Sequence, residues 1–435
     1  MRFIADLHFH SKYSRAVSPK MELDNLAEWG EKKGVAILTS ADFTHPLWFT
    51  EMEKRFLETS SGVYRLKNSP QSPFFIISAE VSLIFPGHRI HLIVFSPNLK
   101  TAKEINRKLS QKGFNLSADG RPIFGISAVS FVGMISKIDP QITFIPAHIW
   151  TPWFSLYGSR SGFGSINQCF ERFASKIPAI ETGLSSDPLM NWQIKELDQK
   201  RIVSFSDSHS LKNLGRNATV FELPENFRYS DLVTAFKTPY RQGVREKKPH
   251  VASTIEFHPE EGRYHYTGHR KCSVCHSPED SQKLGITCPV CGKLLTVGVA
   301  HQVKKLSRAK TIRPKIKIVG GLKIFCHPEN RHHPFISLIP LREIIAEAEK
   351  SGPESKKVAE KYSLAIEKIG PEIEILIKTP VTKIAKSLGE KVAEGIIRNR
   401  TGQVVVEPGY DGLYGKVKIW PKGQKKDKKE QISLF

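Results

Sequence analysis

The amino-acid sequence predicts an α/β fold for its first 221 residues, with the strands forming a largely parallel sheet or a barrel. Short apolar runs of strand length alternate in this part of the chain with amphipathic stretches of helical period, a pattern typical of successive βαβ units. Histidines and carboxylates follow one predicted strand after another, as they do at the mouth of a β/α barrel.

Each element is expected from its own residues. Short apolar runs predict strands at residues 2–7, 35–38, 74–78, 91–95, 143–146, 179–181 and 202–206. Apolar residues at helical spacing predict helices between several of them, such as 22–33 and 189–200. Residues 341–400 are also helical by period, and Gly and Pro at 352–353, 370–371 and 380 divide them into three or four helices.

The composition changes along the chain and indicates four parts. Residues 1–239 are expected to form a metal-dependent catalytic domain, and 240–320 a linker followed by a zinc-binding, basic module. Residues 321–420 should form a small helical C-terminal domain. Residues 421–435 should be a flexible basic tail, because PKGQKKDKKE contains no core-forming side chain.

Length and composition exclude several classes of protein. Of 435 residues, 40% are hydrophobic and 25% charged, which fits a soluble globular protein with more than one domain. No run approaches the roughly 18 to 20 apolar residues of a membrane-spanning helix, and the N-terminus does not have the pattern of a secretion signal. Six cysteines are too few for a disulfide scaffold. We therefore expect a cytoplasmic protein without a membrane partner.

Side chains suited to metal binding recur around the predicted strand ends. In DLHFHS, the period of a strand puts His8 and His10 on one face, and ADFTHP, ISAEVS, HRIHLIVF, IPAHIW and SFSDSHS bring further candidates. The candidate ligands are His8, His10, Asp42, His45, Glu80, His91, His148, Asp207 and His209. Mixed nitrogen and oxygen ligands in this number suit two or three divalent cations. Zn²⁺, Mn²⁺ or Fe²⁺ suit them better than Mg²⁺, which could still support activity.

A cluster of this kind is suited to phosphoester chemistry. Metals about 3.5 to 4 Å apart can activate a shared water and neutralise charge on the leaving oxygen. Glu80 is the expected bridging carboxylate, because one acid among several imidazoles can span two cations. The residues expected to carry the catalysis are His8, His10, Glu80, His148, Asp207 and His209.

Two CxxC pairs predict a structural zinc site. Cys272, Cys275, Cys288 and Cys291 have the spacing that lets two tight turns face one tetrahedral ion. The weighed alternative is a Cys3His site that uses a neighbouring histidine, His269 or His276. Four cysteines would leave no open position, so this zinc should be structural.

The charge indicates a polyanionic partner. The formal net charge is +22, and residues 264–320 alone contain eleven Lys and Arg against two acids. Residues 149–164 are rich in aromatic side chains and glycine, as expected of a pocket that holds an extruded base. The candidate DNA-binding residues are Trp150, Trp153, Tyr157, Arg160, Arg270, Lys271, Lys304, Lys305 and Arg308.

The first half resembles the PHP superfamily. The resemblance rests on the order DLHFHS, D(x2)H, E, H, AH and DSH within residues 1 to 221. It implies a distorted β/α barrel that holds up to three metals. The two-residue separation of Asp42 and His45 differs from the adjacent pair of many members, so either of the two can be the ligand.

Nearly the whole chain resembles the endonuclease Q family. The motifs ADFTHP, AHIWTPWFSLYGSRSGF, EFHPEEGRYHYTGHRKCSVC and PGYDGLYG carry this resemblance. It implies a DNA repair endonuclease that nicks 5′ to uracil, hypoxanthine, xanthine or an abasic site and leaves a 3′-hydroxyl. The alternatives are a PHP-type phosphatase of small phosphate esters and a DNA-binding scaffold with a decayed metal site.

The C-terminal residues QISLF resemble the peptide by which proteins bind the bacterial sliding clamp. Gln431 would supply a polar anchor, and Leu434 with Phe435 would enter an apolar pocket. The sequence therefore predicts two partners, damaged DNA and a replication clamp.

Overall fold

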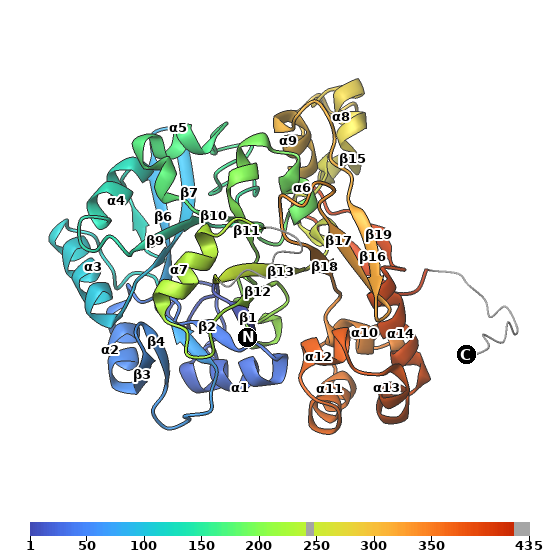
Figure 1. Ribbon diagram of the computed structural model, residues 1–435. Helices are drawn as coiled ribbons and strands as arrows, with labels where there is room; N and C mark the ends of the chain where they lie inside the picture. Colours follow the sequence, from blue (N-terminus) through green and yellow to red (C-terminus); the bar gives the residue numbers. More distant parts are fainter. Residues whose placement is uncertain (241–247, 422–435) are drawn as a thin grey trace, which may run out of the picture.

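The structure analysed is a computed structural model that describes residues 1–240 and 248–421 (Figure 1). The predicted clamp-binding residues Gln431, Leu434 and Phe435 lie outside the described residues. The first part of the chain has the mixed α/β fold that the sequence predicts. Its strands are β1 (Arg2–Asp6), β2 (Ile37–Thr39), β3 (Phe56–Ser60), β4 (Val63–Leu66), β5 (Phe74–Ile76), β6 (Ser78–Phe85), β7 (His88–Phe95), β8 (Ile123–Phe124), β9 (Thr143–Pro146), β10 (Ala179–Glu181), β11 (Arg201–Val203) and β12 (Ala218–Glu222).

Helices lie between several of these strands and cover the outside of the barrel, whereas β3 to β7 follow one another without a helix (Figure 1). The helices are α1 (Leu23–Lys33), α2 (Pro46–Arg55), α3 (Leu99–Gln111), α4 (Ala128–Ile135), α5 (Ile166–Phe170), α6 (Pro188–Trp192) and α7 (Tyr229–Lys237). The predicted helix 189–200 is broken into α6 and a 3₁₀ helix, Lys195–Gln199, because Ile194 between them is extended.

The barrel is distorted because its strands belong to separate sheets. Strands β1, β2 and β5 run parallel in one sheet, β10 and β11 form a parallel pair, and β8-β6-β7-β9 form a third sheet. The expected parallel arrangement is therefore only partial, since β6 and β7 form an antiparallel hairpin. Its two-residue turn is Pro86-Gly87, and Gly87 has a φ of +77°, which favours glycine.

The chain beyond residue 248 begins by extending the first sheet. The order β16-β17-β18-β13-β12-β1-β2-β5-β4-β3 joins early and late strands, so the linker expected after residue 240 leads into the same sheet. The division into four domains stays a prediction. The later strands are β13 (His250–Glu256), β14 (Thr267–His269), β15 (Val274–His276), β16 (Lys315–Val319), β17 (Leu322–Cys326), β18 (Phe335–Ser337), β19 (Val405–Glu407) and β20 (Lys416–Lys418).

Two groups of helices lie beside this extended sheet (Figure 1). One group accompanies the cysteines and the other forms the predicted C-terminal helical region. They are α8 (Pro278–Leu284), α9 (Val299–Leu306), α10 (Leu341–Ala348), α11 (Lys356–Lys368), α12 (Glu372–Ile377), α13 (Val381–Leu388) and α14 (Glu390–Thr401). The C-terminal region has one helix more than expected, because Gly389, with a φ of +90°, separates α13 from α14.

The helical region is fixed to the barrel by a buried ion pair. Lys33 of α1 and Glu372 of α12 approach to 2.7 Å, and Glu372 also accepts a hydrogen bond from Tyr362. Such a pair positions α12 because breaking it would leave one charge buried alone. Among the residues described, no helix has the length and apolar character needed to cross a bilayer.

Candidate active site

Three polar residues that follow strand ends have backbone φ angles that are rare for non-glycine residues. Asp42, His148 and Asp207 follow β2, β9 and β11, and all three have positive φ angles of +38°, +30° and +46°. Non-glycine residues adopt this conformation rarely, and such strain is found most often at functional sites. The local backbone therefore turns these side chains toward one place at the mouth of the barrel.

One group at this mouth joins the segments that follow β1 and β11. The ligand atoms of His8, His10 and Asp207 lie within 4.8 Å of one another, and Asp207 Oδ1 is 3.2 Å from His10 Nε2. The Nε2 atoms of both histidines and Oδ1 of Asp207 are buried without a hydrogen-bond partner. Buried polar atoms are nearly always paired, so these three atoms fit a bound cation.

A second group lies directly beside the first. Glu80 of β6, His91 of β7 and His148 have ligand atoms within 4.8 Å of one another. Glu80 Oε1 is 2.9 Å from His91 Nδ1 and 3.0 Å from His148 Nε2. The same carboxylate approaches the first group, at 3.5 Å from His8 and 3.4 Å from His10. Glu80 therefore lies where a carboxylate that bridges two cations would be expected.

Burial and neighbouring charges shift the pKa values of the side chains in this centre. Burial alone would raise the pKa of Glu80, but His91, His8 and Arg121 outweigh it and hold that pKa well below its ordinary range. Burial lowers the pKa of His91 to about 4, so this imidazole is neutral at pH 7. Burial would also lower the pKa of His8, His10 and His148, but the nearby carboxylates outweigh it and raise these pKa values. A bound cation would take the place of those protons, because Zn²⁺, Mn²⁺ and Fe²⁺ bind ionised carboxylates and neutral imidazoles.

Three other predicted ligands lie outside both groups. Asp42 accepts hydrogen bonds from Ser11 and Ser14 and lies 3.2 Å from Nδ1 of His10, so it orients His10. His45 stacks on Tyr13 with ring centres 4.3 Å apart. The structure thus gives neither member of this pair a place among the grouped ligand atoms. His209 is only half-buried, and its Nδ1 is 2.9 Å from the carbonyl oxygen of Asp207.

Two residues of the centre were not predicted from the sequence. Glu181 ends β10, lies 2.9 Å from Nδ1 of His8 and accepts a hydrogen bond from the backbone of His148. Carboxylates in this position fix the orientation of a ligand histidine. Arg121 donates a hydrogen bond to Glu80 over 3.1 Å. It adds a cation at the edge of the centre.

A cavity of about 500 Å³ opens beside the centre and shares His91, His148 and Asp207 with it. Its remaining walls are largely aromatic and charged. Trp153 and Phe154 come from the loop after β9, and Phe257 and Tyr264 from the segment after β13. Arg216, Glu261, Arg263, Glu343 and Tyr414 also line it.

Residues 149–164, the aromatic and glycine-rich loop, contribute fewer side chains to this cavity than the sequence predicted. Trp150 and Tyr157 are buried in the core, with their polar atoms bound to Asn191 and Glu196. The prediction that they contact a base is therefore wrong for this structure. Trp153 is 39% exposed and lines the cavity, whereas Arg160 is exposed outside it.

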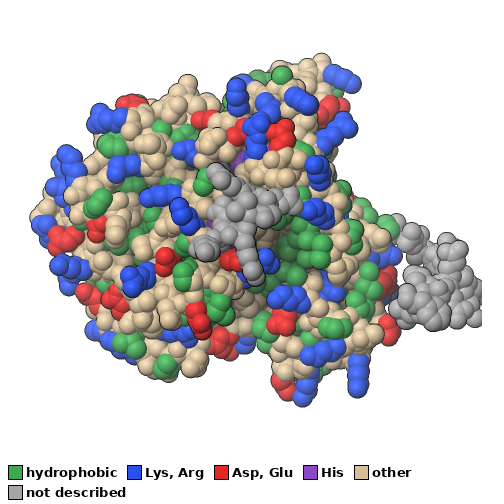
Figure 2. All heavy atoms as spheres, in the orientation of Figure 1, with side chains coloured by type: hydrophobic (Ala, Val, Ile, Leu, Met, Phe, Trp, Pro, Cys, Tyr) green, Lys and Arg blue, Asp and Glu red, His purple; other side chains and the backbone are tan. Residues whose placement is uncertain are grey.

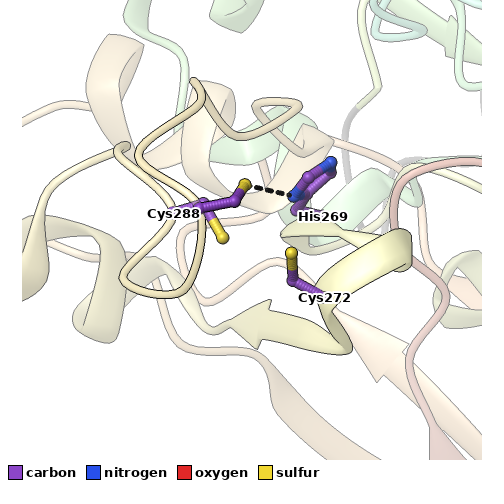
Figure 3. Close-up of side chains that lie close together, drawn as sticks. His269, Cys272 and Cys288 are labelled. Atoms are coloured by element: carbon purple, nitrogen blue, oxygen red, sulfur yellow. Dashed lines mark hydrogen bonds between the residues drawn. The ribbon is translucent and has the colours of Figure 1, made fainter.

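The cysteine module groups one histidine with three cysteines. His269, Cys272, Cys288 and Cys291 have ligand atoms within 4.8 Å of one another, and Figure 3 shows the first three directed toward one another. Cys275 is exposed and outside this group. It is paired with Gly268 in the β14–β15 hairpin, whereas His269 pairs with Val274. Because adjacent strand residues face opposite sides, Cys275 faces away from the side that carries His269.

The set of three thiols and one imidazole fits a structural Zn²⁺. The module's own apolar core is small and consists of Val274, Cys288 and Leu295, with Cys272 packed against it. A bound metal would therefore add substantially to the stability of this part of the chain.

Basic side chains surround this module. Figure 2 shows Lys and Arg on the lobe that carries α8 and α9, and Arg270, Lys271, Lys304 and Lys305 are all exposed. Arg308 differs, because it forms an ion pair of 2.6 Å with Asp198 and is half-buried. Its guanidinium is thus already used within the protein.

Comparisons with known proteins agree with this architecture. Residues 340–403 match the family described as MJ0043 C-terminal domain. The chain is 32% identical over 277 residues to the uncharacterized protein MJ0043 of Methanocaldococcus jannaschii, a match that covers 62% of this chain and 31% of that protein. The chain thus spans about a third of the length of this relative.

Two solved structures match nearly the whole chain. The crystal structure of the lesion-specific endonuclease PfuEndoQ from Pyrococcus furiosus has a TM-score of 0.81 and 29% identity, and covers 96% of this chain and 95% of its own. Endonuclease Q in complex with a 27-mer duplex that has an abasic lesion at the active site also has a TM-score of 0.81 and 29% identity, with 97% of both chains covered. The resemblance to endonuclease Q that the sequence motifs carry is therefore confirmed over nearly the entire chain.

Proposed function

We propose that this protein is a metal-dependent DNA repair endonuclease that nicks the phosphodiester 5′ to a deaminated base or an abasic site. The observation that carries the proposal is the pair of adjacent ligand groups around Glu80, beside a cavity of about 500 Å³ with aromatic walls. The likeness to endonuclease Q, one structure of which holds an abasic lesion at the active site, supports the same assignment.

The residues that would hold the metals are His8, His10 and Asp207 in one group and Glu80, His91 and His148 in the other. Bound divalent cations would supply an activated water and neutralise charge on the phosphate. Within the protein, Glu181 orients His8 and Asp42 orients His10. Arg121, which now pairs with Glu80, is placed to contact a phosphate oxygen.

The cavity is suited to an extruded nucleobase. Aromatic side chains such as Phe257 and Tyr264 offer stacking surfaces, which every base can use. Burial, with the neighbouring Glu343, raises the pKa of Glu261 to about 9, so this carboxyl group is neutral at pH 7. A neutral carboxyl both donates and accepts hydrogen bonds, as the edge of an uncharged base requires.

The test is incision of end-labelled duplexes that differ in one nucleotide. Uracil, hypoxanthine, xanthine and an abasic site are compared with the undamaged sequence, with and without a chelator and with Zn²⁺ or Mn²⁺ restored. We expect a nick directly 5′ to the lesion, a product that a polymerase extends, and loss of activity with the chelator. Equal cutting of undamaged DNA, or cutting that resists chelation, would contradict the proposal.

We also propose that the C-terminal peptide binds a sliding clamp, on the evidence of its sequence. Deleting residues 431–435 should leave nicking of a short oligonucleotide unchanged and abolish capture by an immobilised bacterial clamp. The double variant Leu434→Ala plus Phe435→Ala serves as the finer test, because it keeps the chain length and Gln431 and removes only the two apolar side chains. If this variant and the full-length protein are captured equally, the peptide has no such role.

A further inference from the structure

One aromatic side chain at the cavity rim is largely uncovered. Tyr414 lines the cavity and is 71% exposed, and the adjacent Leu413 is 43% exposed. Together they form an exposed apolar edge beside the cavity, and a ligand that covered this edge would gain free energy by removing it from water. The guanidinium of Arg263 lies 5.2 Å from the centre of the Tyr414 ring.

The loop that carries Tyr414 is held rigidly. Gly409 and Gly415 donate backbone hydrogen bonds to Glu260 and Glu261, and Gly412 donates one to Arg263. At Gly409 and Gly415 an added Cβ would lie within 2.4 and 2.1 Å of a backbone oxygen. The close approach thus admits only glycine, and the loop cannot withdraw Tyr414 from the rim without breaking these contacts.

The cysteine module holds the opposite side of the same loop. Asp411 accepts hydrogen bonds from the backbone of Arg270 over 2.7 Å and from the hydroxyl of Thr296 over 2.6 Å. Arg270 is itself exposed, as are Lys271 and Arg263. Arg263 thus lies beside the protruding ring and the exposed Arg270 is bonded to the same loop, so a polyanion is the partner that this charge would attract.

We propose that Tyr414 enters the duplex at the lesion and occupies the space that the extruded nucleotide leaves in the base stack. This inference rests on the proposed function, since it takes the cavity as the place of the extruded nucleotide. An aromatic ring stacks on the neighbouring bases without regard to sequence. Leu413 adds an apolar contact beside it, as wedge residues of DNA-bending proteins do.

The proposal predicts different effects of a Tyr414 substitution on duplex DNA and on single-stranded DNA. A lesion in single-stranded DNA leaves no paired stack to fill, so Tyr414 should matter only for the duplex. We expect Tyr414→Ala to slow nicking of a uracil-containing duplex by roughly 5- to 150-fold, the range for loss of one base–aromatic stack. On the same strand without its complement, the variant should stay within about two-fold of the wild type.

Two further variants control the experiment. Tyr414→Phe keeps the ring and should nick the duplex within about two-fold of the wild type. Leu294→Ala removes a side chain that is 64% exposed in the cysteine module and does not line the cavity, so it should nick both substrates normally. Thermal unfolding of each variant confirms that the fold is retained.

Two results would overturn the inference. Tyr414→Ala could nick the duplex as fast as the wild type, or it could lose activity equally on duplex and single strand, which would indicate a contact with the lesion nucleotide itself. Both differ from failure of the proposed function, in which the wild-type protein nicks neither lesion substrate.

Discussion

Replacing Glu80 by Gln, or Asp207 by Asn, should lower the rate of lesion nicking by roughly 10³-fold or more. Each change preserves the size of the side chain and removes one anionic ligand. Glu80 contacts both ligand groups, and Asp207 completes the first. Metal ions contribute several kcal/mol to stabilisation of a phosphoryl transition state, and about 1.4 kcal/mol corresponds to a factor of ten in rate.

Binding of lesion DNA should change little in the same variants. Affinity for DNA comes mainly from phosphate contacts, and the exposed cations predicted to bind DNA on the cysteine module, such as Arg270 and Lys304, lie outside the centre. The measurements are single-turnover nicking and a binding titration on the same duplex. Metal content of each purified variant should fall with its activity.

A matched control lies on the same strand as a predicted ligand. His88 begins β7, stacks on Phe163 with ring centres 3.9 Å apart, and lies outside both ligand groups. His88→Gln should therefore nick normally, whereas His91→Gln should fail. If His88→Gln and His91→Gln are equally active, His91 is not a ligand.

The second large effect is expected at the cysteine module. Cys272→Ser and His269→Ala should each lose one equivalent of zinc and destabilise the module. The binding free energy of a structural zinc, about 10–16 kcal/mol in zinc-finger peptides, contributes directly to folding. The module's own core is small, so only its contacts with the rest of the protein, such as the hydrogen bonds to Asp411, would remain. Zinc content and thermal unfolding measure the two effects.

Cys275→Ser is the control that separates the two candidate ligand sets. The structure places Cys275 outside the group, so this variant should keep its zinc and its midpoint of unfolding. Loss of zinc from Cys275→Ser with retention in His269→Ala would instead support the four-cysteine site that the spacing predicts.

The sequence predicted the site best where metal-ligating residues follow the two-residue period of a strand. The HxH pattern after the first strand placed His8 and His10 on one face, and the structure groups them with Asp207. Glu181 was missed because a single acid at the end of the short strand AIE has no neighbouring ligand to distinguish it. Its role arises only when β10 lies close enough for it to reach His8.

The sequence did not predict which aromatic side chains are buried or how the strands of the β14–β15 hairpin are paired. Trp150 and Tyr157 stand in a loop of suitable composition, but Asn191 and Glu196, some 40 residues away along the chain, satisfy their polar atoms in the core. The CxxC spacing likewise does not reveal that Cys275 pairs with Gly268 across a hairpin. In both places tertiary contacts, not local spacing, decide which side of the backbone a side chain takes, and the choice between the two zinc ligand sets stays with the Cys275→Ser test.

The continuous sheet makes truncation after residue 239 a destructive change. Strand β12 pairs with β1 on one side and β13 on the other. Without β13, its backbone groups would become an exposed edge, which favours aggregation. Glu256 of β13 would also no longer accept hydrogen bonds from Thr182 and Ser204. An isolated N-terminal fragment would thus report on misfolding and self-association rather than on any activity of the barrel, and the roles of its residues are better tested by point substitutions.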